Sequence, residues 1–173
     1  CCTAALVCTG PVRSGILGLK FRERKGAAAV FAKYMAEVRY VNSVETCDFV
    51  TAVPLSKRKL ASRGFNQSEL IGRAYASYTG KTYMAGVLTK TKENQTQSAL
   101  RDAKRRVENV KDCYEVRDPS LVRGKRILLV DDVYTTGATI RECARVLRRA
   151  GAETVCGLTA ATAHGQNIKI YKK

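Results

Sequence analysis

A short segment that joins a strand pattern to a helix pattern constrains the fold of this 173-residue chain more than any other feature. It runs from Leu128 to Thr139 and reads LLVDDVYTTGAT. The apolar run Ile127 to Val130 indicates a strand buried on both faces; two aspartates follow, and a helix pattern begins just after Gly137. A buried strand that leads into a helix in this way is typical of α/β proteins, in which helices cover a parallel sheet.

Other short apolar runs indicate further buried strands. Phe49 to Val53 and Val155 to Ala161 have the length and branching that such strands need, and Tyr83 to Leu88 is a weaker candidate. Strands that alternate with helices predict a Rossmann-like open parallel β-sheet with helices on both faces. The length suits a single domain, 1–173, with 10–45 as an N-terminal helical segment.

Three amphipathic helices are indicated by apolar residues at helical spacing. The first contains Val30, Phe31, Tyr34, Met35 and Val38; the second Leu70, Ile71, Ala74, Tyr75 and Tyr78; the third Ile140, Cys143, Ala144 and Leu147. We expect Asn66 or Ser68 to cap the start of the second and Gly80 to end it, while Gly151 ends the third.

The residues after the strand Ile127 to Val130 suit a sugar that carries a phosphate. Asp131 and Asp132 can each accept a hydrogen bond from one hydroxyl of a ribose diol. Gly137 allows a tight turn at the start of a helix, where amides and hydroxyls converge on a phosphate. The expected 5′-phosphate residues are Tyr134, Thr135, Thr136, Gly137, Ala138 and Thr139. The alternative is that these side chains merely cap a strand and a helix.

Other nucleotide-binding motifs are not supported. No G-x-G-x-x-G follows a strand pattern, which disfavours a dinucleotide fold. Gly80-Lys81-Thr82 resembles the end of a P-loop, but it closes a helix pattern instead of opening one. We expect no protein-built metal site, and His164 is expected to be a surface residue.

The charge of the chain favours a polyanionic partner. Lys and Arg number 31 against 15 Asp and Glu, a formal charge of +16, which suits nucleic acid or phosphorylated small molecules. Few aromatic residues accompany the basic clusters, so base stacking is weakly supported. Arg141, Arg145 and Arg148 share one helix face, and this stripe taken alone favours a solvated surface over a binding one. The candidate DNA-binding residues are Lys20, Arg22, Arg24, Lys25, Arg123, Lys125, Arg126, Arg141, Arg145 and Arg148.

The cysteines and the hydropathy predict a cytoplasmic protein with no membrane insertion. The seven cysteines form no C-x-x-C pair, so we expect reduced and mostly buried thiols. No apolar stretch reaches the roughly 20 residues that span a bilayer. The sequence begins on Cys1 and Cys2 instead of methionine, so we expect it to be part of a longer protein.

Several segments together resemble one known family. LLVDDVYTTGAT is similar to the phosphoribosyl pyrophosphate signature of type I phosphoribosyltransferases. Gly10 to Phe21 (GPVRSGILGLKF), Val53 to Leu70 (VPLSKRKLASRGFNQSEL) and a basic loop at 90–109 narrow the resemblance to ComF-type competence proteins. Such proteins often begin with a cysteine zinc module, which this chain lacks except for a possible trace in Cys1 and Cys2.

The resemblance implies a pyrophosphate-binding segment and a flexible basic loop. The first would be Leu55, Ser56, Lys57 and Arg58, and the second would include Lys90, Lys92, Gln97, Arg105 and Arg106. In RGFNQ, Arg63, Asn66 and Gln67 are either ligand-binding or helix-capping residues. The expected ligand is phosphoribosyl pyrophosphate with Mg²⁺ held mainly by the ligand and by water.

Two functions follow from the resemblance. One is DNA uptake in natural competence (transformation), through single-stranded DNA and with a competence helicase or ATPase as a possible partner. The alternative is an active phosphoribosyltransferase of nucleotide metabolism, which passes phosphoribose to a nucleobase or an amine and releases pyrophosphate. The sequence identifies no catalytic residue.

Overall fold

The computed structural model of the chain describes residues 2–21, 24–38, 44–92, 110–163 and 169–170. Its centre is a five-stranded sheet in the order β2-β5-β6-β1-β7, and every pair of neighbours in it is parallel. The strands are β1 (Cys2–Val7), β2 (Phe49–Ala52), β5 (Arg126–Tyr134), β6 (Thr154–Thr162) and β7 (Lys169–Ile170). The predicted open parallel α/β fold is confirmed.

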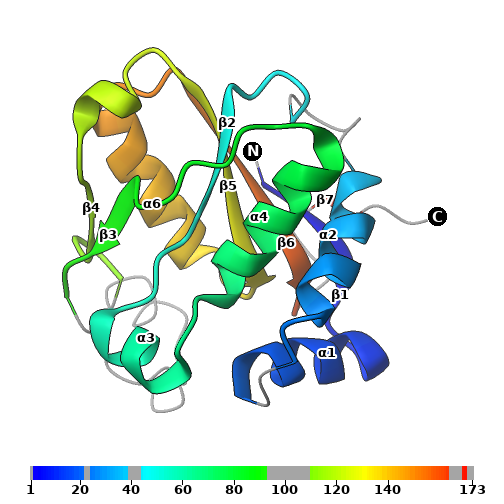
Figure 1. Ribbon diagram of the computed structural model, residues 1–173. Helices are drawn as coiled ribbons and strands as arrows, with labels where there is room; N and C mark the ends of the chain where they lie inside the picture. Colours follow the sequence, from blue (N-terminus) through cyan, green and yellow to red (C-terminus); the bar gives the residue numbers. More distant parts are fainter. Residues whose placement is uncertain (1, 22–23, 39–43, 93–109, 164–168, 171–173) are drawn as a thin grey trace.

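Helices cover both faces of the sheet, as predicted (Figure 1). One face packs against α1 (Gly10–Phe21), α2 (Ala27–Ala36) and α4 (Gln67–Thr79), and β5 contributes Leu128 and Val130 to this core. The other face packs against α6 (Ala138–Arg149), and β5 contributes Ile127 and Leu129. Because alternate residues of β5 enter opposite cores, the strand needs an unbroken apolar run.

Smaller elements complete the second face. The short strands β3 (Leu88–Lys90) and β4 (Tyr114–Val116) pair antiparallel, and a 3₁₀ helix η2 (Pro119–Leu121) precedes β5. Helix α3 (Lys57–Arg63) follows β2. In Figure 1, α1 and α3 lie at the edge of the molecule where β5 and β6 end.

The predicted helices exist, but the buried stripe of α2 was partly wrong. Its buried residues are Ala28, Phe31, Ala32 and Met35, whereas Val30 and Tyr34 are 56% and 48% exposed. Small alanines, which carry little hydrophobic signal, share the inner face with the large residues. In α6 all four predicted residues are buried, and Asn66 and Gly80 cap α4 as predicted.

The strand predictions were right at the centre of the sheet and wrong elsewhere. Tyr83 to Leu88 is not a strand; Tyr83 makes one isolated bridge to Val50, and β3 begins only at Leu88. The strand β1 was not predicted, because CTAALV lacks the branched apolar run of the other strands. It nevertheless lies between β6 and β7 in the sheet.

The other global features concern thiols and membrane segments. Cys47, Cys113, Cys143 and Cys156 are buried thiols that are not joined in disulfides within the described ranges. None of the helices within the described ranges has both the length and the apolar composition of a membrane span.

Candidate functional site

The two adjacent aspartates lie near the carboxyl end of β5 and are almost fully buried. β5 continues through them to Tyr134, so the predicted strand end at Val130 was four residues short. Asp131 is 9% exposed and Asp132 is 5% exposed. Ligands of open parallel sheets bind beyond this edge of the sheet, so the pair stands at the expected position for a binding site.

Polar partners from two helices hold the aspartates. The Ser68 hydroxyl of α4 donates a 2.8 Å hydrogen bond to Asp131 Oδ1, which also accepts the Asp132 amide at 2.9 Å. The Lys20 Nζ at the end of α1 lies 2.7 Å from Asp132 Oδ2. The two carboxylates are therefore fixed in direction before any ligand arrives.

The electrostatics of Asp131 are unusual for a carboxyl group. Burial raises its pKa well above the usual range, and the negative charge of neighbouring Asp132 raises it further. The hydrogen bond from Ser68 and the charge of Lys20 oppose these effects. Raised carboxyl pKa values with specific partners are typical of functional sites.

The turn after β5 connects the aspartates to helix α6. Gly137 has a φ of 72° and precedes the helix with no side-chain cap of its own, although Thr136 Oγ1 accepts the Ala138 amide at 3.4 Å. A Cβ atom on Gly137 would overlap the Tyr134 ring. The position therefore requires glycine for its backbone angle and for its space.

The end of β2 lies beside the start of the aspartate pair, because Ala52 pairs with Val130 in the sheet. Ser56 is buried and caps α3 by accepting the Lys59 amide at 3.4 Å. Lys57 and Arg58, the other two residues of the predicted pyrophosphate segment, belong to α3. Leu55 and Ser56 are the non-helical part of that segment.

Comparison with known proteins places this site in a family. The profile of the phosphoribosyl transferase domain matches residues 75–173, more than half of the chain. DNA utilization protein YhgH of Salmonella typhimurium is 34% identical over 151 residues, 85% of this chain and 65% of that protein. Competence protein ComFC of Streptococcus pneumoniae is 34% identical over 131 residues, 73% of this chain and 52% of that protein. The chain is a ComF-type member of the phosphoribosyltransferase superfamily. It spans less than two thirds of the length of either relative.

A solved structure supports the fold of the ComF-type chain independently. Adenine phosphoribosyltransferase from Thermoanaerobacter pseudethanolicus superposes with a TM-score of 0.54 and 15% identity, over 86% of this chain and 80% of that one. At this identity the likeness concerns the fold alone. The family resemblance that the motifs indicated is confirmed.

The RGFNQ segment of the ComF-type chain has a structural role. Asn66 donates a 2.9 Å hydrogen bond to the carbonyl of Val53 and accepts the Ser68 amide at 3.0 Å, so it caps α4 and ties it to the end of β2. Arg63 donates to the Gln67 side chain at 2.9 Å. For Asn66 the geometry therefore favours capping over direct ligand binding.

The basic loop can be placed only at its ends. Lys90 pairs with Tyr114 in the β3–β4 register, and its Nζ lies 5.3 Å from the centroid of the Tyr114 ring. The Tyr114 hydroxyl is hydrogen-bonded to Thr139 of α6. Lys92 is the last described residue before the gap; Gln97, Arg105 and Arg106 lie outside the described residues, as do Arg22 and His164.

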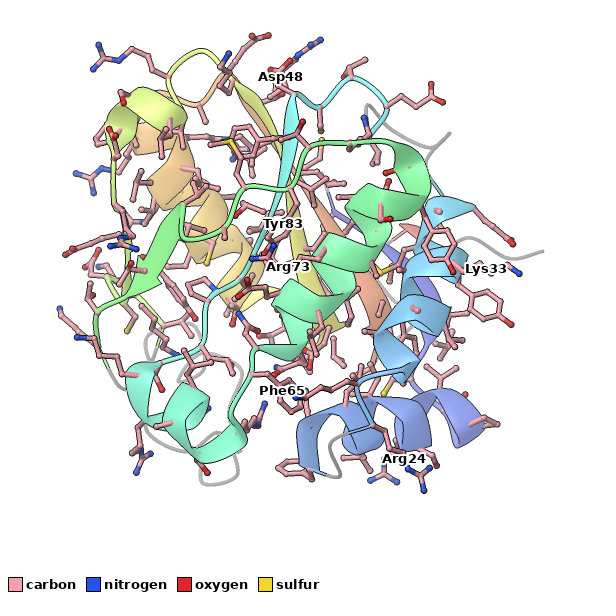
Figure 2. The ribbon with its side chains drawn as sticks, viewed as in Figure 1. Arg24, Lys33, Asp48, Phe65, Arg73 and Tyr83 are labelled. Atoms are coloured by element: carbon pink, nitrogen blue, oxygen red, sulfur yellow. The ribbon has the colours of Figure 1, made fainter. Side chains whose placement is uncertain are left out.

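Those candidate DNA-binding residues that the structure describes do not form one surface. Arg126 pairs with Asp48 at 2.8 Å, and Figure 2 shows Asp48 at the opposite end of the molecule from Phe65, with Arg24 nearer Phe65. Arg123 and Lys125 precede Arg126 in the chain. On α6, Arg145 is ion-paired with Glu142 at 2.6 Å and Asp112 at 2.7 Å. Arg141 donates to the Tyr134 hydroxyl at 3.5 Å, and Arg148 to the Val155 carbonyl at 3.5 Å.

The sequence did not identify Lys20 and Ser68 as the residues that contact the two aspartates. Lys20 was predicted as a DNA contact, and Ser68 only as an alternative helix cap. Both reach the site from helices far away in the sequence. Both residues lie in segments that carry the family resemblance, GPVRSGILGLKF and RGFNQSEL. The resemblance did not specify which atoms they contact.

Proposed function

We propose that this ComF-type chain binds phosphoribosyl pyrophosphate where β5 ends. The observation that carries the proposal is the buried pair Asp131 and Asp132, held by Ser68 and Lys20 and followed by the glycine turn into α6. The family match supports it, because the matched domain is named for phosphoribosyl transfer.

The ribose and its phosphate would occupy adjacent places. The diol would hydrogen-bond to the two carboxylates, with a hydroxyl sharing Asp132 Oδ2 with Lys20 or displacing it. The 5′-phosphate would lie against the turn at Thr135, Thr136 and Gly137, where the amides at the start of α6 point outward. Tyr134, Ala138 and Thr139 border that turn.

The pyrophosphate and its metal ion would lie toward the end of β2. Leu55, Ser56, Lys57 and Arg58 are the proposed contacts there, with Lys90, Lys92 and the loop that follows as further cations. Across the described ranges, no three His, Cys, Asp or Glu side chains cluster as metal ligands. A Mg²⁺ ion would arrive with the ligand and keep most of its water, with Asp131 and Asp132 as nearby carboxylates, and the ion would neutralise part of the charge of the pyrophosphate.

In the cell, we propose a role in DNA uptake through single-stranded DNA. The support is the charge of +16 together with relatives that are named a DNA utilization protein and a competence protein. Contacts of Lys and Arg with phosphates would give affinity that is independent of sequence and falls as salt rises. A cytoplasmic location and a competence ATPase as partner belong to the same proposal.

Calorimetry with phosphoribosyl pyrophosphate and Mg²⁺ tests the binding site. We expect the native chain to bind, and the double variant Asp131→Asn, Asp132→Asn to lose binding while it still unfolds cooperatively, because neutral amides cannot provide the two charge-assisted hydrogen bonds. Equal affinity of the native and double-variant chains would refute the diol assignment.

The same samples, with nucleobases and amines added, test whether the site performs chemistry. Release of pyrophosphate with one acceptor would support the alternative function, phosphoribosyl transfer. Binding without release in any mixture would support the role in DNA uptake.

A further inference from the structure

A hollow of about 510 Å³ lies between the end of α1 and helix α3, next to the aspartate pair. Lys20 belongs to both places, because it lines the hollow and is bonded to Asp132. We call the hollow the α1–α3 pocket. The residues that define it here are four cations, Lys20, Arg58, Lys59 and Arg63, and two aromatic rings, Phe21 and Phe65.

The two rings are the phenylalanines that the core does not use. The chain has four phenylalanines, and Phe31 and Phe49 are buried at 5% and 3% exposure. Phe21 is 69% exposed, and Phe65 is half-buried. Figure 2 shows Phe65 facing the space between the helices at this edge. An exposed ring in a concave site suits a flat apolar ligand better than it suits water.

Cations already lie on these rings. The guanidinium of Arg63 is 5.2 Å from the centroid of Phe21, and Lys25 Nζ is 5.0 Å from the centroid of Phe65. Each aromatic face is thus close to a positive charge that can also reach an anion. Lys20 is paired with Asp132, and the described lining of the pocket itself contains no carboxylate, so the cations that α3 contributes favour an anionic ligand.

We propose that the α1–α3 pocket binds one nucleotide, with its base stacked on Phe21 and Phe65 and its phosphate held by Lys59 and Arg63. Stacking on rings beside a basic groove is how proteins bind single strands without sequence preference. A bare phosphate or pyrophosphate would use the cations and leave the rings without a role. The nucleotide is either free or part of a strand, since both carry a base and a phosphate.

This inference deepens the proposed binding of single-stranded DNA and does not depend on phosphoribosyl pyrophosphate. It also changes where that DNA lies. The basic residues at the opposite edge and on α6 would not form the site, whereas Lys20 lines it and Lys25 lies against its Phe65 ring. Phe21 ends α1 and Phe65 lies between α3 and α4, so the local sequence did not indicate that the two rings share one pocket.

An abasic oligonucleotide separates stacking from phosphate binding. Binding of labelled thymidine and abasic oligonucleotides of equal length is measured by fluorescence anisotropy, and that of thymidine monophosphate by calorimetry. We expect Phe21→Ala to weaken the binding of the thymidine oligonucleotide about tenfold and to leave the binding of the abasic oligonucleotide unchanged. Arg63→Met should weaken both, and the control Tyr34→Ala, which removes an exposed ring on α2, should change neither.

The outcomes distinguish a free nucleotide from a nucleic acid strand, and they test the α1–α3 pocket separately from the phosphoribosyl site. If thymidine monophosphate binds in a Phe21-dependent way and the oligonucleotide binds no more tightly, the ligand is a free nucleotide. If the oligonucleotide binds more tightly than the monophosphate, the ligand is single-stranded nucleic acid. Both outcomes support the proposal. It is overturned if the native chain binds neither ligand, or if Phe21→Ala affects both oligonucleotides equally. Thymidine-strand binding that is insensitive to Phe21→Ala also overturns the pocket assignment but leaves DNA binding elsewhere intact. The Phe21→Ala variant should bind phosphoribosyl pyrophosphate with native affinity. A native chain that does not bind phosphoribosyl pyrophosphate would therefore contradict only the proposed phosphoribosyl site and not the α1–α3 pocket.

Discussion

At the scale of single residues, the aspartate pair is costly to the fold and useful to a ligand. Asp131 is buried among partners that could serve a neutral side chain equally well, since Ser68 and the Asp132 amide both donate to it. A raised pKa in the folded state means that the stability this group contributes is fully present below the unfolded pKa of about 3.9 and is lost as pH rises through the folded value.

Asp131→Asn should therefore remove a pH-dependent loss of stability. We expect the variant to equal or exceed the native chain in free energy of unfolding at pH 8, with the difference shrinking toward pH 4, as measured by urea denaturation. Asp132→Asn is the control, and it should be less stable than the native chain because it leaves Lys20 without its carboxylate. A native chain that is more stable than Asp131→Asn at pH 8 would contradict the assignment.

Gly137 is constrained both by its left-handed backbone angle and by the lack of space for a Cβ atom, and a comparison with Gly124 separates the two effects. Gly124 has nearly the same backbone angle, φ 67° against 72°, but nothing lies within 4 Å of its added Cβ. Gly124→Ala should cost about 1 kcal/mol of stability for the left-handed backbone alone. Gly137→Ala should cost more, because its methyl group would overlap the Tyr134 ring.

Thermal or urea unfolding of the two alanine variants measures this difference. Adding Tyr134→Ala to Gly137→Ala should recover the excess and leave only the backbone cost. Equal losses in Gly124→Ala and Gly137→Ala would mean that the Tyr134 contact does not constrain the turn.

The residue types at the site were predictable, and their partners were not. Asp131, Asp132 and Gly137 follow from the order strand, carboxylates, glycine, helix, which is local in sequence. Lys20 and Ser68 reach the carboxylates through the packing of α1 and α4 on the sheet. That packing depends on contacts between distant segments, which local patterns do not encode.

At the scale of secondary-structure elements, predictions held best where apolar side chains recur along the buried part of the element. The centres of β2, β5 and β6 and the predicted stripe of α6 meet that condition, whereas in α4 Ile71 and Tyr75 are buried but Tyr78 is 55% exposed. β5 was predicted too short because the buried carboxylates of Asp131 and Asp132 look like the start of a loop. The inner face of α2 was misassigned because alanines fill half of it.

Asn66 joins two elements, and its removal should weaken both. It caps α4 and also binds the Val53 carbonyl, so Asn66→Ala loses a cap and leaves a buried carbonyl without its partner. We expect a loss of about 2–3 kcal/mol in the free energy of unfolding. Asp118→Ala removes a similar side-chain cap from the exposed helix η2 and should cost less. The two losses, compared by urea denaturation, would be equal if the bond to Val53 were without effect.

At the scale of the whole molecule, the arrangement of charge matters more than its total. The net charge of +16 follows from composition, but its distribution does not: Arg126 and Arg145 are ion-paired with carboxylates outside the α1–α3 pocket. Cations from α1 and α3 collect instead at the edge that also holds the aspartates (Figure 1). The fold thus brings two proposed anion sites side by side, with Lys20 between them.

This arrangement predicts that the two ligands assist each other. A ribose hydroxyl that takes Asp132 Oδ2 would release Lys20 toward a phosphate in the pocket, and a phosphate that attracts Lys20 would free Asp132 for the diol. We expect a saturating thymidine oligonucleotide to tighten the binding of phosphoribosyl pyrophosphate about fivefold, and the reverse experiment to give the same factor, since coupling between sites is reciprocal.

Lys20→Met should abolish the coupling even where it changes the two separate affinities, because no other described residue both lines the pocket and pairs with Asp132. Lys33→Met, which removes an exposed lysine of α2 away from both sites, should retain the native factor (Figure 2). Titrations of each ligand with and without the other, in all three chains, measure the factors directly. A native chain whose ligands bind independently, or a Lys20→Met variant with the native factor, would show that Lys20 does not link the sites.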